Sequence, residues 1–526
     1  MDRAEMMGRV RGRREPWDVV VIGGGATGVG VAVDAASRDY DVLLIEGHDF
    51  GKGTSSRSTK LAHGGVRYLA RGDVALVREA LRERGLLRRN APHLVRDLPF
   101  VVPCYGRWDR PYYGLGLKVY DLLAGRTGFE GSRSLSRDET IARLPTIQPT
   151  GLRGGVLYHD GRFDDARLLI NLVTTAAEQG ATLLNYARVT ALTREPGGRV
   201  HGVVAVDTET GEEFQAGARV VVNATGAFCD AVRAMADPGS ARIIAPSRGA
   251  HLVLDRSFLP GDAAMMVPRT SDGRVMFAIP WHGRTLVGTT DVPVDSATIE
   301  PVASDAEVDF LLDTASAYLD RRPTRDDIRS IFAGIRPLVR ARGAKNTAAL
   351  SRDHTIEVDR SGLVTVAGGK WTTYRNMAED AVDRAAIVAG LRSRPCVTPT
   401  LAIHGAIADA DKFGDFAVYG SDARTIISLS ESDPSLADRL DARLPMIGAE
   451  VVWAARHEMA RTVEDVLSRR TRALVLDARA AIAMAPRVAS LLAVELGRDD
   501  VWVVGQVEAF GDLAHDYLPY PGERGA

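Results

Sequence analysis

The chain has 526 residues, of which 45% are hydrophobic and 25% are charged, and its formal net charge is −2 at pH 7. A chain of this length predicts two or three domains, because a single hydrophobic core does not grow this large. The composition is that of an ordinary globular protein, and the small net charge gives no sign of a nucleic-acid-binding surface, so we expect no nucleic-acid partner.

The cysteines and the N-terminal residues exclude further classes of protein. Cys104, Cys229 and Cys396 lie far apart and form no CxxC pair, which favours a reducing compartment and argues against disulfides or a structural zinc. Residues 1–18 include basic residues but lack the apolar segment of a secretory signal. No run of about 18 apolar residues occurs, so we expect no membrane-spanning helix, although contact with a membrane surface needs no such run.

The first predicted elements form a strand–helix–strand unit at residues 18–46. The first strand ends at Gly23, and Gly25 and Gly28 complete a GxGxxG spacing, which lets the backbone approach a pyrophosphate and the helix pack closely on the strand. Glu46 ends the second strand, 18 residues after Gly28, where a carboxylate binds ribose hydroxyls and repels a 2′-phosphate. These features predict a dinucleotide cofactor other than NADP.

Three later segments offer backbone and hydroxyl groups to the same ligand. The loop 47–65 is rich in Gly, Ser and Thr and is costly to order unless it holds something. The segments 219–230 and 363–383 each run from an apolar strand into a glycine-containing turn. A cofactor contacted from such distant parts of the chain indicates an extended dinucleotide such as FAD. The predicted contacts are Thr54, Ser55, Ser58, Lys60, His63, Gly64, Ala224, Thr225, Gly226, Gly369, Thr372 and Thr373.

Taken together, these motifs resemble those of aerobic, FAD-dependent glycerol-3-phosphate dehydrogenases. The matching segments are GGGATGVGVA, TSSRSTKLAHGGVRYL, the NATG strand, GIRPLV, SRDH and GGKWTTYR, followed by YGSDA and EVVWAARHEMARTVEDVLSRRT in the tail. The resemblance implies oxidation of sn-glycerol 3-phosphate to dihydroxyacetone phosphate, with the electrons passed to a membrane quinone. It also implies a homodimer that binds peripherally to the inner, cytoplasmic face of the cell membrane.

Glycerol 3-phosphate is close to dianionic at neutral pH, so its binding site requires cations with directional donors. Arg67, Arg336 and Lys370 supply three cations from distant segments, and Tyr68 adds a neutral donor. Lys370 stands at the start of a predicted helix, where the helix dipole disfavours a cation unless it serves a ligand. We therefore expect these residues to form one substrate pocket beside the flavin.

Oxidation at C2 also requires a base for the hydroxyl proton, and histidine has a suitable pKa. His251 precedes an apolar strand in PSRGAHLVLD, a segment that the resemblance places in the substrate domain facing the flavin. His63 lies in the flavin loop and is the alternative, with a possible role next to N5. Arg336 is expected to stabilise the developing alkoxide as well as the phosphate.

The remaining segments define the expected organisation of an α/β chain. We expect a Rossmann-like FAD-binding domain of the D-amino-acid-oxidase type, a substrate domain with an antiparallel sheet, and a C-terminal α-helical domain without an obvious catalytic group. The predicted domains are FAD-binding (15–80, 160–240 and 345–390), substrate-binding (81–159 and 241–344) and C-terminal helical (401–526).

Three other stretches have simple interpretations. The arginine-rich run 78–89 predicts a solvated amphipathic helix. The apolar segment 114–125 could contact lipid or be buried in the core, and the sequence leaves both readings open. HEMAR (457–461) has Arg461 in place of the second histidine of a zinc-binding HExxH, so we expect no metal.

Alternative functions share the same flavin site. A glycerol-3-phosphate oxidase would use O2 and release H2O2, and the sequence does not decide between O2 and quinone. An amine or amino-acid oxidase on a related fold would need a carboxylate-binding cation but not three cations and a tyrosine. A non-catalytic flavin-binding module would have no use for Arg67, Arg336, Lys370 and His251 together.

Overall fold

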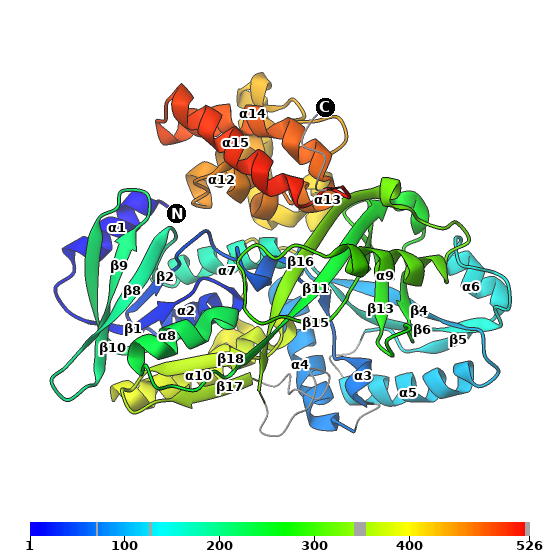
Figure 1. Ribbon diagram of the computed structural model, residues 1–526, viewed down its shortest axis with the longest axis horizontal. Coiled ribbons are helices and arrows are strands. Elements are labelled where there is room, and N and C mark those ends of the chain that lie inside the picture. Colours follow the sequence, from blue (N-terminus) through cyan, green and yellow to red (C-terminus); the bar gives the residue numbers. More distant parts are fainter. Residues whose placement is uncertain (70–71, 126–128, 341–353, 521–526) are drawn as a thin grey trace.

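The computed structural model describes residues 1–69, 72–125, 129–340 and 354–520, except for the side chain of Arg67 (Figure 1). The described chain forms two β-sheets with helices packed against them and a group of helices near its C-terminal end. In Figure 1 the C-terminal helices, coloured orange and red, lie above the region where the two sheets meet.

The first sheet is mainly parallel. Its strands, in spatial order, are β17 (His354–Val358), β18 (Val364–Gly368), β10 (Glu213–Asn223), β1 (Trp17–Ile22), β2 (Val42–Ile45) and β7 (Thr182–Leu184). Only β17 runs antiparallel to its neighbour in this order. The strands β8 (Ala187–Arg194) and β9 (Val200–Asp207) extend β10 as an antiparallel layer. The helices that pack here are α1 (Arg3–Gly12), α2 (Ala26–Ser37), α7 (Asp165–Glu178), α8 (Cys229–Ala236) and α10 (Tyr374–Ala389).

The central strand β1 is buried on both faces, which explains its nearly continuous run of apolar residues. Val19 and Val21 belong to the core beneath α2, α7 and α10, whereas Val20 and Ile22 belong to a second core that includes residues of α1. Alternate side chains of one strand therefore enter two different cores. This arrangement fixes the carboxyl edge of the parallel strands, where the site described below is formed.

The second sheet is antiparallel except where β12 runs parallel to β4. Its strands are β3 (Leu61–Ala62), β4 (Arg96–Cys104), β5 (Arg133–Leu135), β6 (Gly154–Arg162), β11 (Ile244–Asp255), β12 (Ala264–Val267), β13 (Met276–Trp281), β14 (Arg284–Gly288), β15 (Val292–Pro293) and β16 (Ile328–Val339). The helices of this part are α3 (Val66–Leu69), α4 (Val74–Asn90), α5 (Asp109–Ala124), α6 (Arg137–Arg143) and α9 (Asp305–Ser316). The domain limits expected from the sequence stay a prediction.

The helix α4 differs from the solvated helix predicted for the run 78–89. Glu83 and Arg84 are both buried. Glu83 receives two hydrogen bonds from Arg375, at 2.7 and 2.8 Å, and Arg84 forms an ion pair with Asp160. Partners supplied by distant segments allow charged residues of this helix to face inward, because buried charges are tolerated when they are paired.

The C-terminal helices pack against β16 of the second sheet and, through η11, against α7 of the first. They are α11 (Ala423–Ser432), α12 (Gly448–His457), the π-helix η11 (Asp465–Arg470), α13 (Ala473–Leu476), α14 (Ala478–Leu496) and α15 (Asp500–His515). Short 3-10 helices are η1 (Thr54–Ser56), η3 (Gly226–Phe228), η4 (Arg256–Phe258), η5 (Arg325–Asp327), η7 (Trp371–Thr373), η8 (Thr398–Thr400) and η10 (Pro434–Leu436). The longer η9 (Ala410–Asp422) is interrupted by non-helical backbone at Gly414 and Gly420. No helix within the described ranges has both the length and the hydropathy required to cross a bilayer.

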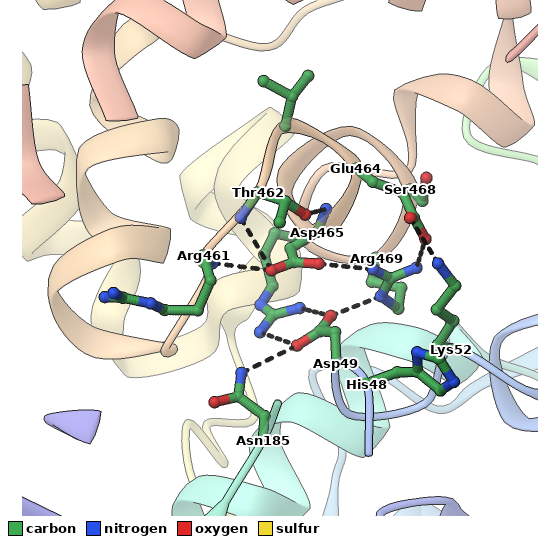
Figure 2. A network of polar contacts seen from close by, with 12 residues as sticks. His48, Asp49, Lys52, Asn185, Arg461, Thr462, Glu464, Asp465, Ser468 and Arg469 are labelled. Atoms are coloured by element: carbon green, nitrogen blue, oxygen red, sulfur yellow. Dashed lines mark hydrogen bonds and ion pairs between the residues drawn. The ribbon is translucent and has the colours of Figure 1, made fainter. Parts of the chain in front are cut away.

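A buried ionic network joins η11 to the loop that follows β2 (Figure 2). The carboxylate of Asp49 accepts hydrogen bonds from Arg469 Nε at 2.5 Å and from Arg470 Nη1 and Nη2 at 2.5 and 2.9 Å. Burial alone would raise the pKa of Asp49, but the charges of Arg470 and Arg469 outweigh it and lower that pKa to about 2. Glu464 extends the network, because it binds both Arg469 and Lys52 at 2.7 Å. The C-terminal region is therefore anchored to one specific loop of the first sheet.

We expect Asp49→Asn to destabilise the folded protein by about 3 kcal/mol at pH 7, because it leaves two buried guanidinium groups without their carboxylate. The native pKa of about 2 lies below the ordinary value of 3.8, so the stabilisation is complete above about pH 4 and is lost as the pH falls through about 2. Thermal unfolding midpoints of the wild type and the variant should therefore converge over that interval.

Asp41→Asn is the matched control, because Asp41 pairs with Arg13 at the surface, where an ion pair contributes less than about 1 kcal/mol. If Asp49→Asn and Asp41→Asn shift the unfolding midpoint equally at pH 7, the anchoring role of Asp49 is wrong.

Candidate active site

A cavity of about 450 Å³ lies where the chain leaves the carboxyl ends of β1, β2, β10 and β18. These four strands are parallel neighbours, so the turns that follow them meet at one edge of the sheet. The predicted cofactor contacts that line this cavity are Gly23, Gly25, Glu46, Thr54, Ser55, Ala224, Thr225, Gly226 and Gly369. Residues from the beginning, the middle and the last third of the chain thus line the same cavity.

The glycine turn after β1 is shaped for close approach of a ligand to the backbone. Gly23 has φ +109°, and a Cβ there would stand 2.8 Å from the carbonyl oxygen of Ala224. A Cβ on Gly28 would stand 1.9 Å from the carbonyl oxygen of Gly23, so this glycine permits α2 to pack against the turn. Gly25 is the N-cap residue of α2 and has no side chain to cap the helix, so the amides at this helix start are suited to bind an anion. The cradle fits a pyrophosphate.

Glu46 closes the next turn and also orders it. Its carboxylate accepts hydrogen bonds from the Gly24 amide at 2.7 Å and from the His48 amide at 2.8 Å. Burial raises the pKa of Glu46, although both backbone hydrogen bonds oppose that shift. The carboxylate lines the cavity, in the position expected for binding the hydroxyls of a ribose. The donor set and the glycine cradle together fit FAD.

The hydroxyl-rich loop after Glu46 is locked to other parts of the site. Thr54 donates a hydrogen bond to the carbonyl oxygen of Ile335 at 2.6 Å. The carbonyl oxygen of Ser55 accepts a hydrogen bond from the indole of Trp371 at 2.8 Å. The hydroxyl of Ser55 accepts another from the amide of Ala26 at 2.9 Å. Three segments that are remote in sequence are thereby held at fixed positions around the cavity.

Several predicted cofactor contacts lie outside the cavity lining within the described residues, namely Gly28, Ser58, Lys60, His63, Gly64, Thr372 and Thr373. Ser58 and Lys60 both bind Asp165, at 2.7 Å from its Oδ2, and Lys60 is fully buried. Burial lowers the pKa of Lys60 to about 7, although the negative charge of Asp165 acts to raise it. The structure gives these two residues partners within the protein, and their predicted contact with FAD stays a prediction.

Two of the predicted substrate residues contact each other at the edge of the cavity. Lys370 lines the cavity directly after Gly369, and its Nζ lies 4.1 Å from the centre of the Tyr68 ring. Tyr68 itself is buried in α3. Arg67 is in the same helix, and its side chain lies outside the part of the chain that the structure describes.

Arg336 lies on β16, next to the cavity-lining Pro337. Its Nη2 donates hydrogen bonds at 2.9 Å to the hydroxyl of Thr289 and to the carbonyl oxygen of Thr290. Asp291 approaches its Nη1 at 3.4 Å. A Cβ on Gly249 of the neighbouring β11 would stand 2.4 Å from the guanidinium, so a larger residue there would displace Arg336. The strand pair β11–β16 therefore sets the position of this cation.

The two candidate bases have different surroundings. His251 is only 2% exposed, its ring stacks on Phe332 with centroids 4.7 Å apart, and its Nε2 lies 2.9 Å from the Thr59 hydroxyl. Burial, followed by the charges of Lys60 and Arg336, holds the pKa of His251 well below its ordinary value, so the imidazole is neutral at pH 7. His63 is half-buried, and its amide donates to the Thr372 hydroxyl at 3.2 Å.

The sequence analysis did not identify the charged side chains that hold the loop after β2 in place around the cavity. Arg472 donates hydrogen bonds at 2.9 Å to the carbonyl oxygen of Ser56 and to Asp165, and Lys52 lines the cavity while it binds Glu464. The signal in the sequence is the cluster of Arg469, Arg470 and Arg472, which begins inside the last segment that resembles the family and continues just beyond it. No group of three or more potential metal ligands occurs among the described residues.

Comparisons with known proteins agree with this geometry. The profile of the family described as FAD dependent oxidoreductase matches residues 18–384, and that of the C-terminal domain of alpha-glycerophosphate oxidase matches residues 396–501. A mitochondrial glycerol-3-phosphate dehydrogenase of Arabidopsis thaliana is 43% identical over 91% of this chain and 83% of its own length. The human mitochondrial glycerol-3-phosphate dehydrogenase is 39% identical over 94% of this chain and 72% of its own length.

A solved structure extends the comparison to the whole fold. The glycerol-3-phosphate dehydrogenase from Bacillus halodurans, solved in complex with FAD, covers 100% of this chain and 99% of its own, with a TM-score of 0.81 and 28% identity. The predicted fold class, including the C-terminal helical domain, and the predicted FAD cofactor are confirmed. The chain belongs to the family of FAD-dependent glycerol-3-phosphate dehydrogenases.

Proposed function

We propose that this protein oxidises sn-glycerol 3-phosphate to dihydroxyacetone phosphate and passes the electrons to a quinone in the membrane. FAD, when bound, supplies the acceptor of the hydride that leaves C2, at flavin N5. The protein's own residues bind the phosphate, orient C2 and remove the hydroxyl proton. The observation that best supports this function is a lysine, Lys370, placed at the edge of the FAD cavity against Tyr68.

Lys370 is suited to a phosphate because its surroundings favour an anion. It directly precedes η7, and the amides at the start of a helix attract negative charge. A cation at this position is disfavoured by the same amides unless an anion lies between them. The ammonium group adds a compact charge, and Tyr68 supports it through its ring face. We assign the phosphate to this place.

Arg336 is assigned to the other side of the substrate. Its guanidinium group is held by hydrogen bonds to Thr289 and Thr290, so the cation is preorganised before the substrate enters. A preorganised guanidinium stabilises both a phosphate oxygen and the alkoxide that develops as the C2 hydroxyl loses its proton. Arg67 completes the proposed set of cations.

His251 is the proposed base. Its imidazole is neutral at pH 7, because burial lowers its pKa, so the ring can accept a proton. The hydrogen bond between Nε2 and Thr59 fixes the ring, and the stack on Phe332 limits its rotation. His63 remains the alternative, because it lies in the loop that meets η7 through Thr372.

The proposed quinone acceptor requires contact with a membrane, and α5 offers a suitable surface. Trp108, Tyr112, Leu115, Val119 and Leu122 are exposed at spacings of three and four residues, so they form one side of a helix, called here the α5 outer face. The basic residues Arg110, Lys118 and Arg133 line a shallow cavity of about 290 Å³ next to it. An apolar helix face bordered by cations matches a bilayer with anionic lipids.

Localisation at the inner face of the cell membrane and assembly as a homodimer form part of the same proposal. The second candidate acceptor is O2, because the C-terminal region matches a domain described for alpha-glycerophosphate oxidase.

The test of the function is anaerobic. Adding sn-glycerol 3-phosphate to the purified FAD-loaded protein should bleach the flavin absorbance, and adding a short-chain quinone should restore it. Reoxidation by air with stoichiometric H2O2, faster than by quinone, would assign the oxidase function instead. A flavin that the substrate does not bleach would exclude both.

We expect Lys370→Met, studied in the same assay, to raise KM for glycerol 3-phosphate by roughly tenfold to a hundredfold, because the variant keeps the apolar stem but loses a charge-assisted hydrogen bond. Lys412→Met is the control, since Lys412 pairs with Asp409 at the surface. A KM for Lys370→Met equal to that of the control would refute the phosphate assignment.

We expect His251→Ala to slow anaerobic flavin reduction by roughly a hundredfold or more while the spectrum of the bound flavin is retained, because the variant removes the general base. His63→Ala is measured alongside by stopped-flow absorbance. If flavin reduction is slow in His63→Ala and as fast as in the wild type in His251→Ala, His63 is the general base.

We expect the double variant Leu115→Glu/Leu122→Glu to lose co-flotation with vesicles that contain anionic phospholipid, because charges replace side chains that are 72% and 81% exposed on the α5 outer face. The control is Val494→Glu/Val501→Glu, which alters valines that are 80% and 79% exposed on the C-terminal helices. Loss of flotation in the control alone would place the membrane contact on the C-terminal helices.

A further inference from the structure

The buried side of α5 reaches the flavin loop through a single tyrosine. Tyr120 is 1% exposed, and its hydroxyl oxygen accepts a hydrogen bond from the amide of Gly64 at 2.8 Å. The same hydroxyl donates to the carboxylate of Asp160, with Oδ1 at 3.0 Å and Oδ2 at 2.9 Å. One side chain thus connects a helix of the second sheet to the turn formed by His63, Gly64 and Gly65.

The acceptor of this hydrogen bond is itself held in place. Asp160 is buried on β6 and forms an ion pair with Arg84 of α4, which is also buried. Burial raises the pKa of Asp160, whereas the charge of Arg84 opposes that shift. Burial, with the nearby carboxylate of Asp160, raises the pKa of Tyr120 well above its ordinary value, so the phenol keeps its proton and remains a donor.

The turn passes close to Tyr120, and a side chain at Gly64 would not fit there. A Cβ added at Gly64 would stand 2.7 Å from the Tyr120 hydroxyl oxygen and 2.7 Å from Leu81. Gly65 has φ +79°, a conformation that side chains other than glycine rarely adopt. The Tyr120 hydroxyl is therefore a polar contact that holds this turn, beside the carboxylate of Asp160, which the Gly64 amide also approaches.

Both ends of the turn lead to residues of the proposed substrate site. On one side the His63 amide binds Thr372, two residues after Lys370. On the other side Tyr68 packs in the same apolar cluster as Tyr120 and supports the Lys370 ammonium. A shift of Gly64 would therefore move His63 and Tyr68 relative to Lys370.

We propose that Tyr120 is a positioning residue for substrate binding, which acts by fixing the His63–Gly64–Gly65 turn against Asp160. This inference rests on the proposed glycerol-3-phosphate site, because Tyr120 acts there through Tyr68 and His63. Removing the phenol oxygen leaves the Gly64 amide and the Asp160 carboxylate each without this partner, and a buried group without its partner favours another conformation of the turn.

The test compares Tyr120→Phe with Tyr158→Phe. Tyr158 is equally buried, its ring packs edge-on against Tyr120, and its hydroxyl donates to the Met266 sulfur at 3.3 Å and not to the turn. We expect KM for glycerol 3-phosphate to rise roughly tenfold in Tyr120→Phe and to stay within twofold of the wild type in Tyr158→Phe.

Amide hydrogen exchange supplies a readout that does not depend on turnover. Exchange in a peptide covering residues 61–69 should accelerate roughly tenfold in Tyr120→Phe and be unchanged in Tyr158→Phe. Unaltered KM and unaltered exchange in a folded, FAD-loaded Tyr120→Phe protein would overturn the proposal, as would equal effects of the two variants.

The wild type provides a check that does not require either variant to fold. Its Gly64 amide should exchange as slowly as the amides of β6, and fast exchange would overturn the proposal. If glycerol 3-phosphate fails to bleach the wild-type flavin, the proposed function is wrong, whereas the exchange measurements still decide whether Tyr120 fixes the turn.

Discussion

The architecture depends on one buried ionic contact, in which Asp49 lies between Arg469 and Arg470. A carboxylate so far from water is stable only when opposite charges and hydrogen-bond donors surround it. Both arginines come from the π-helix η11, so the loop after β2 takes its outer wall from the C-terminal helices. Residues of that loop, among them Lys52, Thr54 and Ser55, line the cavity that fits FAD. The C-terminal helices therefore hold in place a loop that shapes this cavity.

Further ionic and hydrogen-bonded contacts hold the rest of this loop, toward the proposed catalytic centre. Lys52 binds Glu464, Ser56 receives a hydrogen bond from Arg472, and Lys60 forms an ion pair with Asp165. Each contact fixes one point of a segment that would otherwise be a long, glycine-rich loop. The charge of Lys60 in turn helps to keep His251 neutral, because it adds to the effect of burial on the pKa of that imidazole. The ion pair of the loop and the proposed proton acceptor, His251, are therefore linked electrostatically.

The features of the cavity that the sequence locates are those determined by local pattern. Gly23, Gly25 and Glu46 could be placed because a strand, a tight turn and a helix follow one another within thirty residues or so, and each step has its own residue preference. The contact of Asp49 with Arg470 spans 421 positions, and no periodicity encodes such a pairing. Glu83 and Arg84 were expected in water for the same reason, since their partners lie in α10 and β6. The burial of His251 depends on the register of β11 against β14 and β16, which only the assembled sheet defines.

The helix α5 has one side turned outward, and on its other side Tyr120 binds the turn formed by His63, Gly64 and Gly65. When one protein binds two ligands, the factor by which the first ligand changes the affinity for the second equals the factor by which the second changes the affinity for the first. If a bilayer rests on the outer side of α5 and the metabolite binds beyond its inner side, any factor by which the substrate changes the affinity for lipid equals the factor by which lipid changes the affinity for the substrate. A rise in the metabolite would then recruit or release its own dehydrogenase.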